Sequence, residues 1–297
     1  MGFKVRRLPC QCGDVINVSS LPDNVIMFNP SVAYPILCFR AMSMIKTHDI
    51  SDIVLHNIET KKIEIISTCN HLLPNVNLYQ GLEDVRVVWH NSRLWFTASS
   101  THASEHMISD LVVGYFNEAL SDIEAIVTID VSSRPIKNIC PFVHDNKIKL
   151  LDLFTSTIYT LDSDKVDKSD ISVVDKSDIY KVELQHCEGV SIDGIRGSCS
   201  PIHLHGNVWG CVGHDCIFYD NSKFVSKLSY LHYWIEFDIV TKSITFVSSP
   251  FWIARWGVEF VSGIHYQNDQ VTLYLGVDDT RPMFAVTTLA DLRVGKQ

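Results

Sequence analysis

Apolar residues occur along the chain in short bursts of four to eight, rich in valine, isoleucine and aromatic residues and separated by Asn, Asp, Gly and Ser. This pattern is typical of β-strands joined by turns. Helical periodicity is nearly absent. Residues 104–119 are the one weak helix candidate, and Val112, Val113 and Gly114 favour a strand at its end. The pattern predicts an all-β protein.

Five segments follow the same plan, in which a polar cluster leads into a strand, a turn follows, and a second strand of bulky apolar residues comes next. These second strands begin at residues 36, 94, 148, 208 and 271, so the spacings are 58, 54, 60 and 63 residues. A period of this length has room for the four strands of a propeller blade. We therefore expect residues 1–297 to form a single five-bladed β-propeller with a central active-site pocket; a β-sandwich with accidental spacing is the alternative.

One segment, residues 163–179, departs from this plan. The hexapeptide Val-Asp-Lys-Ser-Asp-Ile occurs twice in it, at 166–171 and at 174–179. A short polar duplication of this kind is typical of a surface loop. We expect an exposed loop insertion between outer strands.

The charge balance narrows the class of partner. The chain carries 34 acidic and 25 basic side chains, which gives a formal net charge of −9. This disfavours nucleic-acid binding, because such proteins need a basic surface to displace counterions from phosphates. The hydrophobic fraction of 46% is enough to build a large core.

Targeting and cysteine patterns favour a cytoplasmic protein. There is no run of 18 apolar residues, and no apolar segment follows the basic residues near the start, so neither a membrane span nor an export signal is expected. The nine cysteines are scattered and do not form two CxxC pairs, which disfavours a structural zinc site. Reduced, mostly buried thiols are the simplest interpretation.

In a propeller, the residues that open the innermost strands meet at one face of the axis. The polar clusters of the five segments would therefore form one pocket. That pocket would contain Asn29, Ser31, Arg40, Glu83, Asp84, Arg86, Lys137, Asn138, Arg196, Ser198, His214, Asp215, Glu259 and Asp278. Carboxylates and amides suit the hydroxyls of a sugar, and cationic groups suit a phosphate. Trp95, Trp234 and Trp252 are candidates to stack on a sugar ring.

Taken singly, each of these residues has a simpler explanation. The pair Glu83 and Asp84 is more often part of a turn or an ion pair than a catalytic group, and Arg86 is an available partner for it. Placement at equivalent points of a repeat is what favours a functional site.

The motifs resemble a known family. Asn29-Pro30-Ser31 with Arg40, followed by Gly81-Leu82-Glu83-Asp84-Val85-Arg86, is similar to the opening of the five-bladed propeller glycosidases and phosphorylases, above all the β-1,2-mannoside phosphorylases and their protozoan mannosyltransferase relatives. Later motifs resemble a related branch of glycosyltransferase-like propellers from bacteria, giant viruses and some eukaryotes. They lie at 137–142, 196–198, 213–215, 230–233, 259–263 and 276–279.

The resemblance implies roles for matching residues. Asp84 would be the acid/base, because the Asp of the Glu-Asp-x-Arg motif has that role in the phosphorylases. Asn29, Ser31 and Arg40 would hold the donor sugar. The remaining implied ligands, for inorganic phosphate or a nucleotide diphosphate, are Lys137, Arg196, His214 and Tyr230. Val85 stands where the family has Pro, a departure that bears on phosphorolysis.

We therefore expect a glycosyltransferase that moves a sugar from a nucleotide-sugar donor to a glycan hydroxyl. An inverting transfer needs a carboxylate base for the acceptor hydroxyl and cationic or hydrogen-bonding groups for the departing phosphate. Asp84 is the first candidate base, with Glu259 and Asp215 as further candidates. The expected substrate-binding residues are Asn29, Ser31, Arg40, Glu83, Arg86, Lys137, Asn138, Arg196, His214, Tyr230, His232 and Asp278.

Two other functions stay open. The same pocket would serve a glycoside phosphorylase or hydrolase that uses phosphate or water in place of the glycan acceptor. A non-catalytic carbohydrate-binding propeller is the third possibility, although lectin propellers repeat one site per blade and these five clusters differ. No cofactor is expected, and Asp278 with Asp279 is the candidate pair for a divalent metal.

Overall fold

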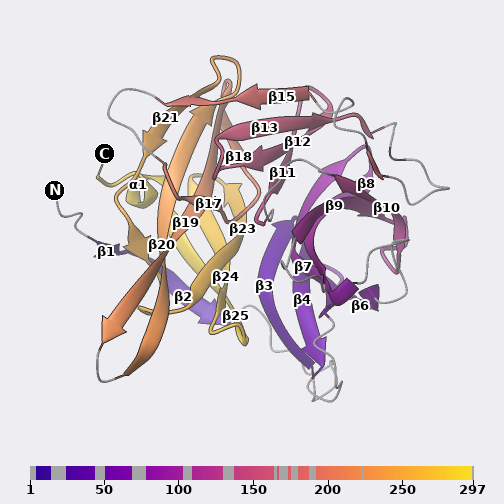
Figure 1. Cartoon of the computed structure of the whole chain (residues 1–297), viewed down its shortest axis with the longest axis horizontal. Coiled ribbons are helices and arrows are strands. Elements are labelled where there is room, and N and C mark those ends of the chain that lie inside the picture. Colours follow the sequence, from indigo (N-terminus) through magenta and orange to yellow (C-terminus); the bar gives the residue numbers. More distant parts are fainter. Residues whose placement is uncertain are drawn as a thin grey trace.

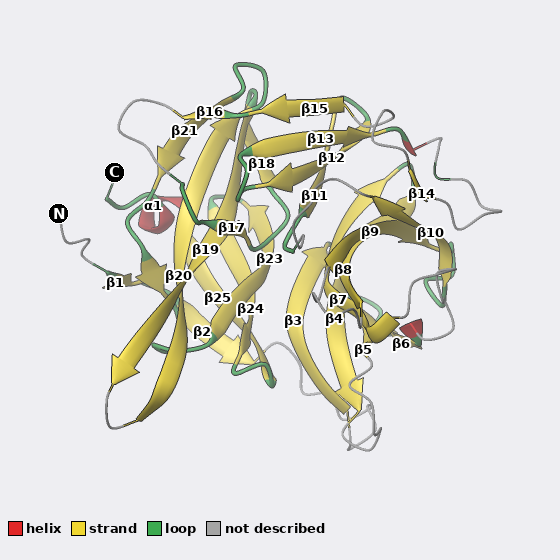
Figure 2. Cartoon of the chain, in the orientation of Figure 1, coloured by secondary structure: helices red, strands yellow, loops and turns green. Residues whose placement is uncertain are grey.

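The computed structural model describes residues 5–14, 25–43, 51–68, 78–102, 109–129, 137–163, 166, 173–174, 180–186, 192–221 and 224–295. These residues form strands and the turns and loops that join them, with one short α-helix, α1 (Leu289–Leu292) (Figure 2). The all-β prediction is confirmed.

The N-terminal half forms a nine-stranded sheet (Figure 1). Its strands are β3 (Val25–Ala33), β4 (Ile36–Ser43), β5 (Ser51–Asn57), β6 (Ile63–Ile66), β7 (Leu78–His90), β8 (Arg93–His102), β9 (Ser109–Phe116), β10 (Ile123–Ile129) and β14 (Val173–Val174). β3 to β6 and β7 to β10 are two antiparallel groups, each with its strands in chain order. A single parallel residue pair, Ser51 with Gly81, joins the two groups.

The C-terminal half forms three sheets. The first contains β11 (Cys140–His144), β12 (Lys147–Asp152), β13 (Thr157–Leu161) and β15 (Tyr180–Glu183). The second contains β16 (Gln185–His186), β17 (Arg196–Gly197), β18 (Ile202–His205), β19 (Val208–Asn221), β20 (Phe224–Asp238), β21 (Ser243–Val247), β22 (Phe251–Trp252) and β1 (Arg6–Arg7). The third contains β23 (Glu259–Gln267), β24 (Gln270–Val277), β25 (Arg281–Thr288) and β2 (Gln11–Asp14).

The first two strands of the chain complete its last two sheets. β1 pairs in parallel with β22, and β2 pairs antiparallel with β25. In Figure 1 these indigo strands lie among the orange and yellow ones. The β23 strand also contacts β3, where the Ser262 hydroxyl donates to the Pro30 carbonyl at 3.0 Å. Strand pairing and a hydrogen bond thus join the N-terminal strands to the C-terminal sheets.

Three of the turns expected from the sequence join the strands that the repeat predicted. Asn91-Ser92, Asp145-Asn146 and Asn268-Asp269 connect β7 to β8, β11 to β12 and β23 to β24, and both residues of each turn have a positive φ. Such two-residue turns match the twist of antiparallel strands, and Asn and Asp tolerate the left-handed backbone. All five predicted second strands lie within observed strands, namely β4, β8, β12, β19 and β24.

Apolar side chains fill the space between successive strand groups. One core cluster lies between the β3–β6 and β7–β10 groups, and another lies between β8–β10 and β12–β13. The largest lies among β11–β13, β19–β21 and β23–β25. Over the described ranges, no helix has the length and apolar character needed to cross a bilayer.

One local expectation needs correction, and the structure describes only a few residues of the segment that carries another. The described part of 104–119 is the strand β9 followed by a turn, because its β-branched residues pair with β8 and β10. Within 163–179, Val166 is 4% exposed in a core cluster, and Val173 and Val174 form β14 beside β10. At Val166 the segment is packed rather than exposed, since this side chain lies in the core cluster that also contains residues of β10 and β13. The rest of the segment, apart from Ser163, lies outside the described residues.

Candidate active site

One pocket of about 420 Å³ collects side chains from three of the four sheets and from the segment that leads into β11. Eight of the residues expected at the site line it, and they are Asn29, Arg40, Asp84, Lys137, Asn138, Arg196, His214 and Tyr230. The other lining residues are Phe28, Met42, Cys216, Phe260 and Asp279. The volume is in the range of sites for small molecules such as a sugar.

Backbone irregularities place two of the polar side chains. The register of β3 shifts between Phe28 and Ser31, and that of β7 shifts between Glu83 and Arg86. Asn29 and Asp84 lie at these shifts with φ of 50° and 52°. A bulge turns a side chain away from the regular alternation of a strand. Here the two bulges bring the side chains together, and Asn29 Nδ2 donates to Asp84 Oδ1 at 3.0 Å.

Glu83 lies behind the pocket surface and holds two of its cations. Its Oε1 is 3.5 Å from Arg40 Nη2, and its Oε2 is 3.3 Å from Lys137 Nζ. Arg40 Nε also donates to Ser51 Oγ at 2.7 Å, and its guanidinium lies over the ring of Phe28. The 6% exposure of Glu83 makes it a positioning group for these cations.

A second carboxylate, Asp279, lies within electrostatic reach of Asp84. Burial and then the negative charge of Asp84 raise the pKa of Asp279. Burial raises the pKa of Tyr230 to about 12, with smaller contributions from Cys216, Asp279 and Asp84. Two carboxylates in different environments are the arrangement that separates an acid from a base.

His214 enters the pocket as a neutral side chain. It is 2% exposed, and burial, followed by electrostatic interactions with His232, Arg196 and Arg86, lowers its pKa well below the usual value. Its Nδ1 lies 2.8 Å from Ser198 Oγ, and its ring meets Phe260 edge-on. It therefore offers hydrogen bonding to a ligand without charge.

Arg86 supports this histidine from inside the protein. Its side chain is fully buried, its Nε donates to the Ser198 carbonyl at 2.5 Å, and its guanidinium lies over Phe260. Ser31 is also fully buried, and its hydroxyl accepts from the Val87 amide at 3.1 Å. Both residues hold the surrounding backbone in place and do not themselves line the pocket.

Ser31, Glu83, Arg86 and Ser198 thus lie behind the pocket lining, and four further expected residues are not among the lining residues either. Glu259 is fully buried, and its carboxylate accepts the backbone N–H groups of residues 253–255 at 2.5, 2.9 and 3.1 Å, so it is occupied in holding that segment. His232 is fully buried beside it and accepts from the Val261 amide at 3.4 Å. Asp215 lies between two pocket-lining residues of β19 and faces the opposite side of that strand. Asp278 pairs with Arg255 at 2.7 Å.

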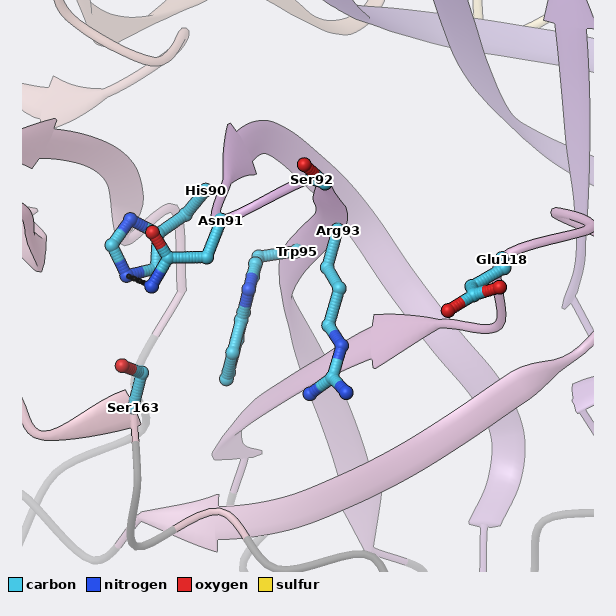
Figure 3. Close-up of a pocket in the computed structure, with 7 residues that line it drawn as sticks. All are labelled: His90, Asn91, Ser92, Arg93, Trp95, Glu118 and Ser163. Carbon is cyan, nitrogen blue, oxygen red and sulfur yellow. Dashed lines mark hydrogen bonds between the residues drawn. The ribbon is translucent and has the colours of Figure 1, made fainter.

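None of the three tryptophans lines this pocket. Trp234 is fully buried, and Arg7 covers Trp252. Trp95 lies in a second pocket of about 400 Å³ at the β7–β8 turn, where Figure 3 shows it beside Arg93. The aromatic lining of the candidate site comes instead from residues 28, 230 and 260.

The pocket residues that the sequence analysis left out are Phe28, Met42, Cys216 and Phe260, and Asp279 had been considered only for a metal. Phe28 and Phe260 each adjoin a polar motif, which is the one signal that could have found them. No group of three or more His, Cys, Asp or Glu side chains in the described part of the chain is arranged to hold a metal ion.

A scan with protein-family models and a search of curated proteins gave no match. Solved structures do match. A GDP-Man-dependent mannosyltransferase from Leishmania mexicana is 16% identical with a TM-score of 0.64, over 91% of this chain and 87% of that one. A mannose phosphorylase from the same organism, solved with a phosphate ion, is 14% identical with a TM-score of 0.60, over 98% and 92%.

A third match comes from work on the GH130 family of mannoside phosphorylases, which contains glycoside hydrolases that target β-1,2-mannosidic linkages in Candida mannan. It is 13% identical, with a TM-score of 0.56 over 97% of both chains. These matches confirm, at the level of the fold, the resemblance that the sequence motifs indicated. The chain has the fold of the GH130 mannoside phosphorylases and of the Leishmania mannosyltransferase.

Proposed function

We propose that this protein is a glycosyltransferase that moves a sugar from a nucleotide-sugar donor to a glycan hydroxyl. The observation that carries the proposal is that one pocket contains two carboxylates, Asp84 and Asp279, together with the guanidinium of Arg196. Within the described residues, no carboxylate forms an ion pair with Arg196. Its charge is therefore available for a phosphate group of the donor.

The reaction assigns a task to each group. Asp84 accepts the proton of the acceptor hydroxyl as that oxygen bonds to the anomeric carbon of the donor sugar. The bond between this carbon and the phosphate oxygen breaks, and the electron pair leaves with the nucleotide diphosphate. Arg196 and Lys137 stabilise the charge that develops on the leaving group. Asn29 orients Asp84 through their hydrogen bond.

We also propose that the chain is a single five-bladed propeller with this pocket at its centre. Each of the five strand groups is an antiparallel run, and successive groups pack against one another. The contact of β23 with β3 and the pairing of β2 with β25 support closure into a ring. The pocket residues come from three of the four sheets and from the segment before the fourth, which supports its central position.

A phosphorylase is the second candidate. The same cations that would bind a diphosphate suit inorganic phosphate, and one structural neighbour is a mannose phosphorylase solved with a phosphate ion. In that reaction phosphate would attack the anomeric carbon, and an acid would protonate the departing sugar oxygen. The raised pKa of Asp279 suits such an acid.

Ligand binding and product analysis separate the two candidates. Because one structural neighbour is GDP-Man-dependent, GDP-mannose and GDP are the first nucleotides to test, with UDP-glucose, UDP and inorganic phosphate beside them. The proposal expects thermal stabilisation by a nucleotide sugar and release of nucleotide diphosphate when a mannoside acceptor is added. Stabilisation by phosphate alone, with sugar 1-phosphate formed from an oligomannoside, would select the phosphorylase. Binding of an oligosaccharide with no turnover under either condition would support a non-catalytic protein.

A further inference from the structure

The sequence Cys10-Gln11-Cys12 places two thiols in contact near the start of the chain. Their Sγ atoms are 3.3 Å apart. Side chains two residues apart in an extended segment point to the same face, which explains the approach. Cys12 is exposed, whereas Cys10 is half-buried and packs against the largest core cluster.

The backbone on both sides of the pair is fixed. The Leu8 amide donates to the Trp252 carbonyl at 2.8 Å, and the Pro9 carbonyl accepts from the Thr287 hydroxyl at 2.7 Å. Cys12 is itself paired with Ala285 in the ladder between β2 and β25. The two thiols are therefore held together by the fold and not by a chance contact of a loose end.

The other described cysteines lack this combination of exposure and contact. Cys38, Cys140, Cys199 and Cys211 are buried, and Cys216 is half-buried in the lining of the candidate active site. Among the described cysteines, only Cys12 is exposed. A reagent in solution therefore reaches Cys12 before the other cysteines that the structure describes.

We propose that Cys10 and Cys12 form a dithiol that reacts with small-molecule disulfides and closes to an intramolecular disulfide. A disulfide bond is about 2.05 Å long, so the sulfur atoms need to approach by a little more than about 1 Å. Rotation of the exposed Cys12 side chain supplies such a movement. This is a modification site separate from the sugar pocket, and it does not rest on the function proposed above.

The reaction with oxidised glutathione balances in two steps. The Cys12 thiolate attacks one sulfur of oxidised glutathione, the glutathione S–S bond breaks, and one reduced glutathione leaves with a proton. The Cys10 thiolate then attacks Cys12 Sγ in the mixed disulfide, and the second glutathione leaves with the other proton. The protein loses two electrons and two protons, and both are recovered in two molecules of reduced glutathione.

Burial fixes the order of these steps. Burial, and then the hydrogen bond with Cys12, raises the pKa of Cys10 to about 12. A thiol that is reluctant to ionise is a poor first nucleophile in solution. It becomes effective when its target sulfur is already in contact, as in the mixed disulfide on Cys12.

The test uses the full-length protein, incubated with oxidised glutathione, then unfolded, alkylated and digested with trypsin. The tryptic peptide 8–40 contains Cys10, Cys12 and Cys38. After oxidation it should accept alkylating reagent at Cys38 alone and should have lost two hydrogen atoms, and dithiothreitol should restore all the labelling sites. Cys216→Ser is the matched control, because it removes a half-buried thiol from another part of the molecule and should leave this result unchanged.

Two variants of the pair make the proposal falsifiable. Cys10→Ser should retain a stable glutathione on Cys12, because the resolving thiol is missing, and Cys12→Ser should form neither the adduct nor the disulfide in this peptide. A wild-type protein that keeps glutathione on Cys12 with Cys10 free would overturn the proposal. A peptide that stays fully reduced, or a bridge from Cys12 to another cysteine, would overturn it as well.

Discussion

Asn29 and Asp84 are 55 residues apart in the chain, and the amide of the first donates to the carboxylate of the second at 3.0 Å. Each residue lies at a register shift with a left-handed backbone, so two separate bulges are needed to form this one hydrogen bond. Backbone irregularities of this kind gather at functional sites. The bond leaves the second carboxylate oxygen of Asp84 for a substrate.

Replacing this carboxylate tests its role as the base. Asp84→Asn keeps the shape and the hydrogen bond from Asn29 but cannot accept a proton. We expect turnover to fall by about 10²–10⁴-fold, the usual contribution of general base catalysis. Initial rates of nucleotide diphosphate release measure the loss, and the thermal unfolding midpoint checks that the fold is intact.

Asp215→Asn is the matched control for that variant. Asp215 lies on the face of β19 away from the pocket, so this change should leave the rate near that of the wild type. If Asp84→Asn keeps more than about a tenth of the wild-type rate, the loss is smaller than a general base supplies. Asp84 would then not be the base.

The adjacent residues Asp278 and Asp279 should behave differently. Asp279 faces the pocket and Asp278 pairs with Arg255, so Asp279→Asn should lower kcat/KM by about 10–100-fold, while Asp278→Asn should have little effect on it. Kinetic assays of the two variants side by side give the comparison. Equal losses would show that the pair acts through the turn and not through one side chain.

Asp279→Asn should also stabilise the fold at neutral pH. The folded state raises the pKa of this carboxyl above 3.8, so its ionised form destabilises the fold at neutral pH. Removal of the charge should therefore raise the free energy of unfolding there. The gain should fade as the pH drops through the raised pKa and should vanish below 3.8, where the wild-type carboxyl is protonated in both states. Denaturant unfolding at several pH values measures this difference.

Much of the site could be predicted because its polar residues recur at equivalent points of a repeat, although Asn29 and Asp84 lie at bulges inside their strands and not at the strand starts. Asn29, Asp84, Asn138 and Arg196 stand at such positions, and the fold brings them to one pocket. The turns at 145–146 and 268–269 carried equally clear signals, since Asn and Asp at two consecutive positions favour a left-handed backbone.

The errors arose where sequence cannot distinguish two physical situations. A carboxylate that binds backbone N–H groups in the interior, as Glu259 does, has the same sequence context as a catalytic one. His232 is similar, because a histidine inside a strand gives no sign of its burial. Asp278 and Asp279 are adjacent and chemically identical, and they differ in that the turn places the side chain of Asp279 in the pocket and that of Asp278 beside Arg255. Burial and turn direction depend on distant parts of the chain, so only the structure reveals them.

Arg196→Gln tests the cation that would bind the donor phosphate. This variant keeps a long polar side chain but removes the charge. A hydrogen bond to a charged group contributes about 1.5–3 kcal/mol, so we expect KM for the nucleotide sugar to rise by about 10–100-fold. KM for an uncharged glycan acceptor should change little.

The control for the loss of positive charge is Arg281→Gln. Arg281 pairs with Asp14 at 2.7 Å on an exposed part of the molecule, away from the pocket lining. This variant should leave KM for the donor unchanged. If both variants raise it equally, the effect comes from the overall charge of the protein and not from a phosphate contact.

His232 should make the stability of the protein dependent on pH. Burial lowers its pKa from 6.5 to about 4. Although Glu259 Oε1 lies 3.6 Å from its Nδ1, burial outweighs this contact, and the carboxylate is already bound to three backbone N–H groups. The unfolded chain therefore takes up a proton at this histidine as the pH falls below 6.5, whereas the folded chain does so only near pH 4.

This difference in proton uptake at His232 determines how the free energy of unfolding changes with pH. Stability is complete above pH 6.5 and is lost as the pH falls toward 4, and the loss from this one group is on the order of 3 kcal/mol. His232→Gln can still accept from the Val261 amide but does not titrate, so its free energy of unfolding should fall less over the same interval. Urea unfolding of both proteins across this pH range measures the difference. A difference between them that stays constant with pH would mean that folding does not lower the pKa of His232.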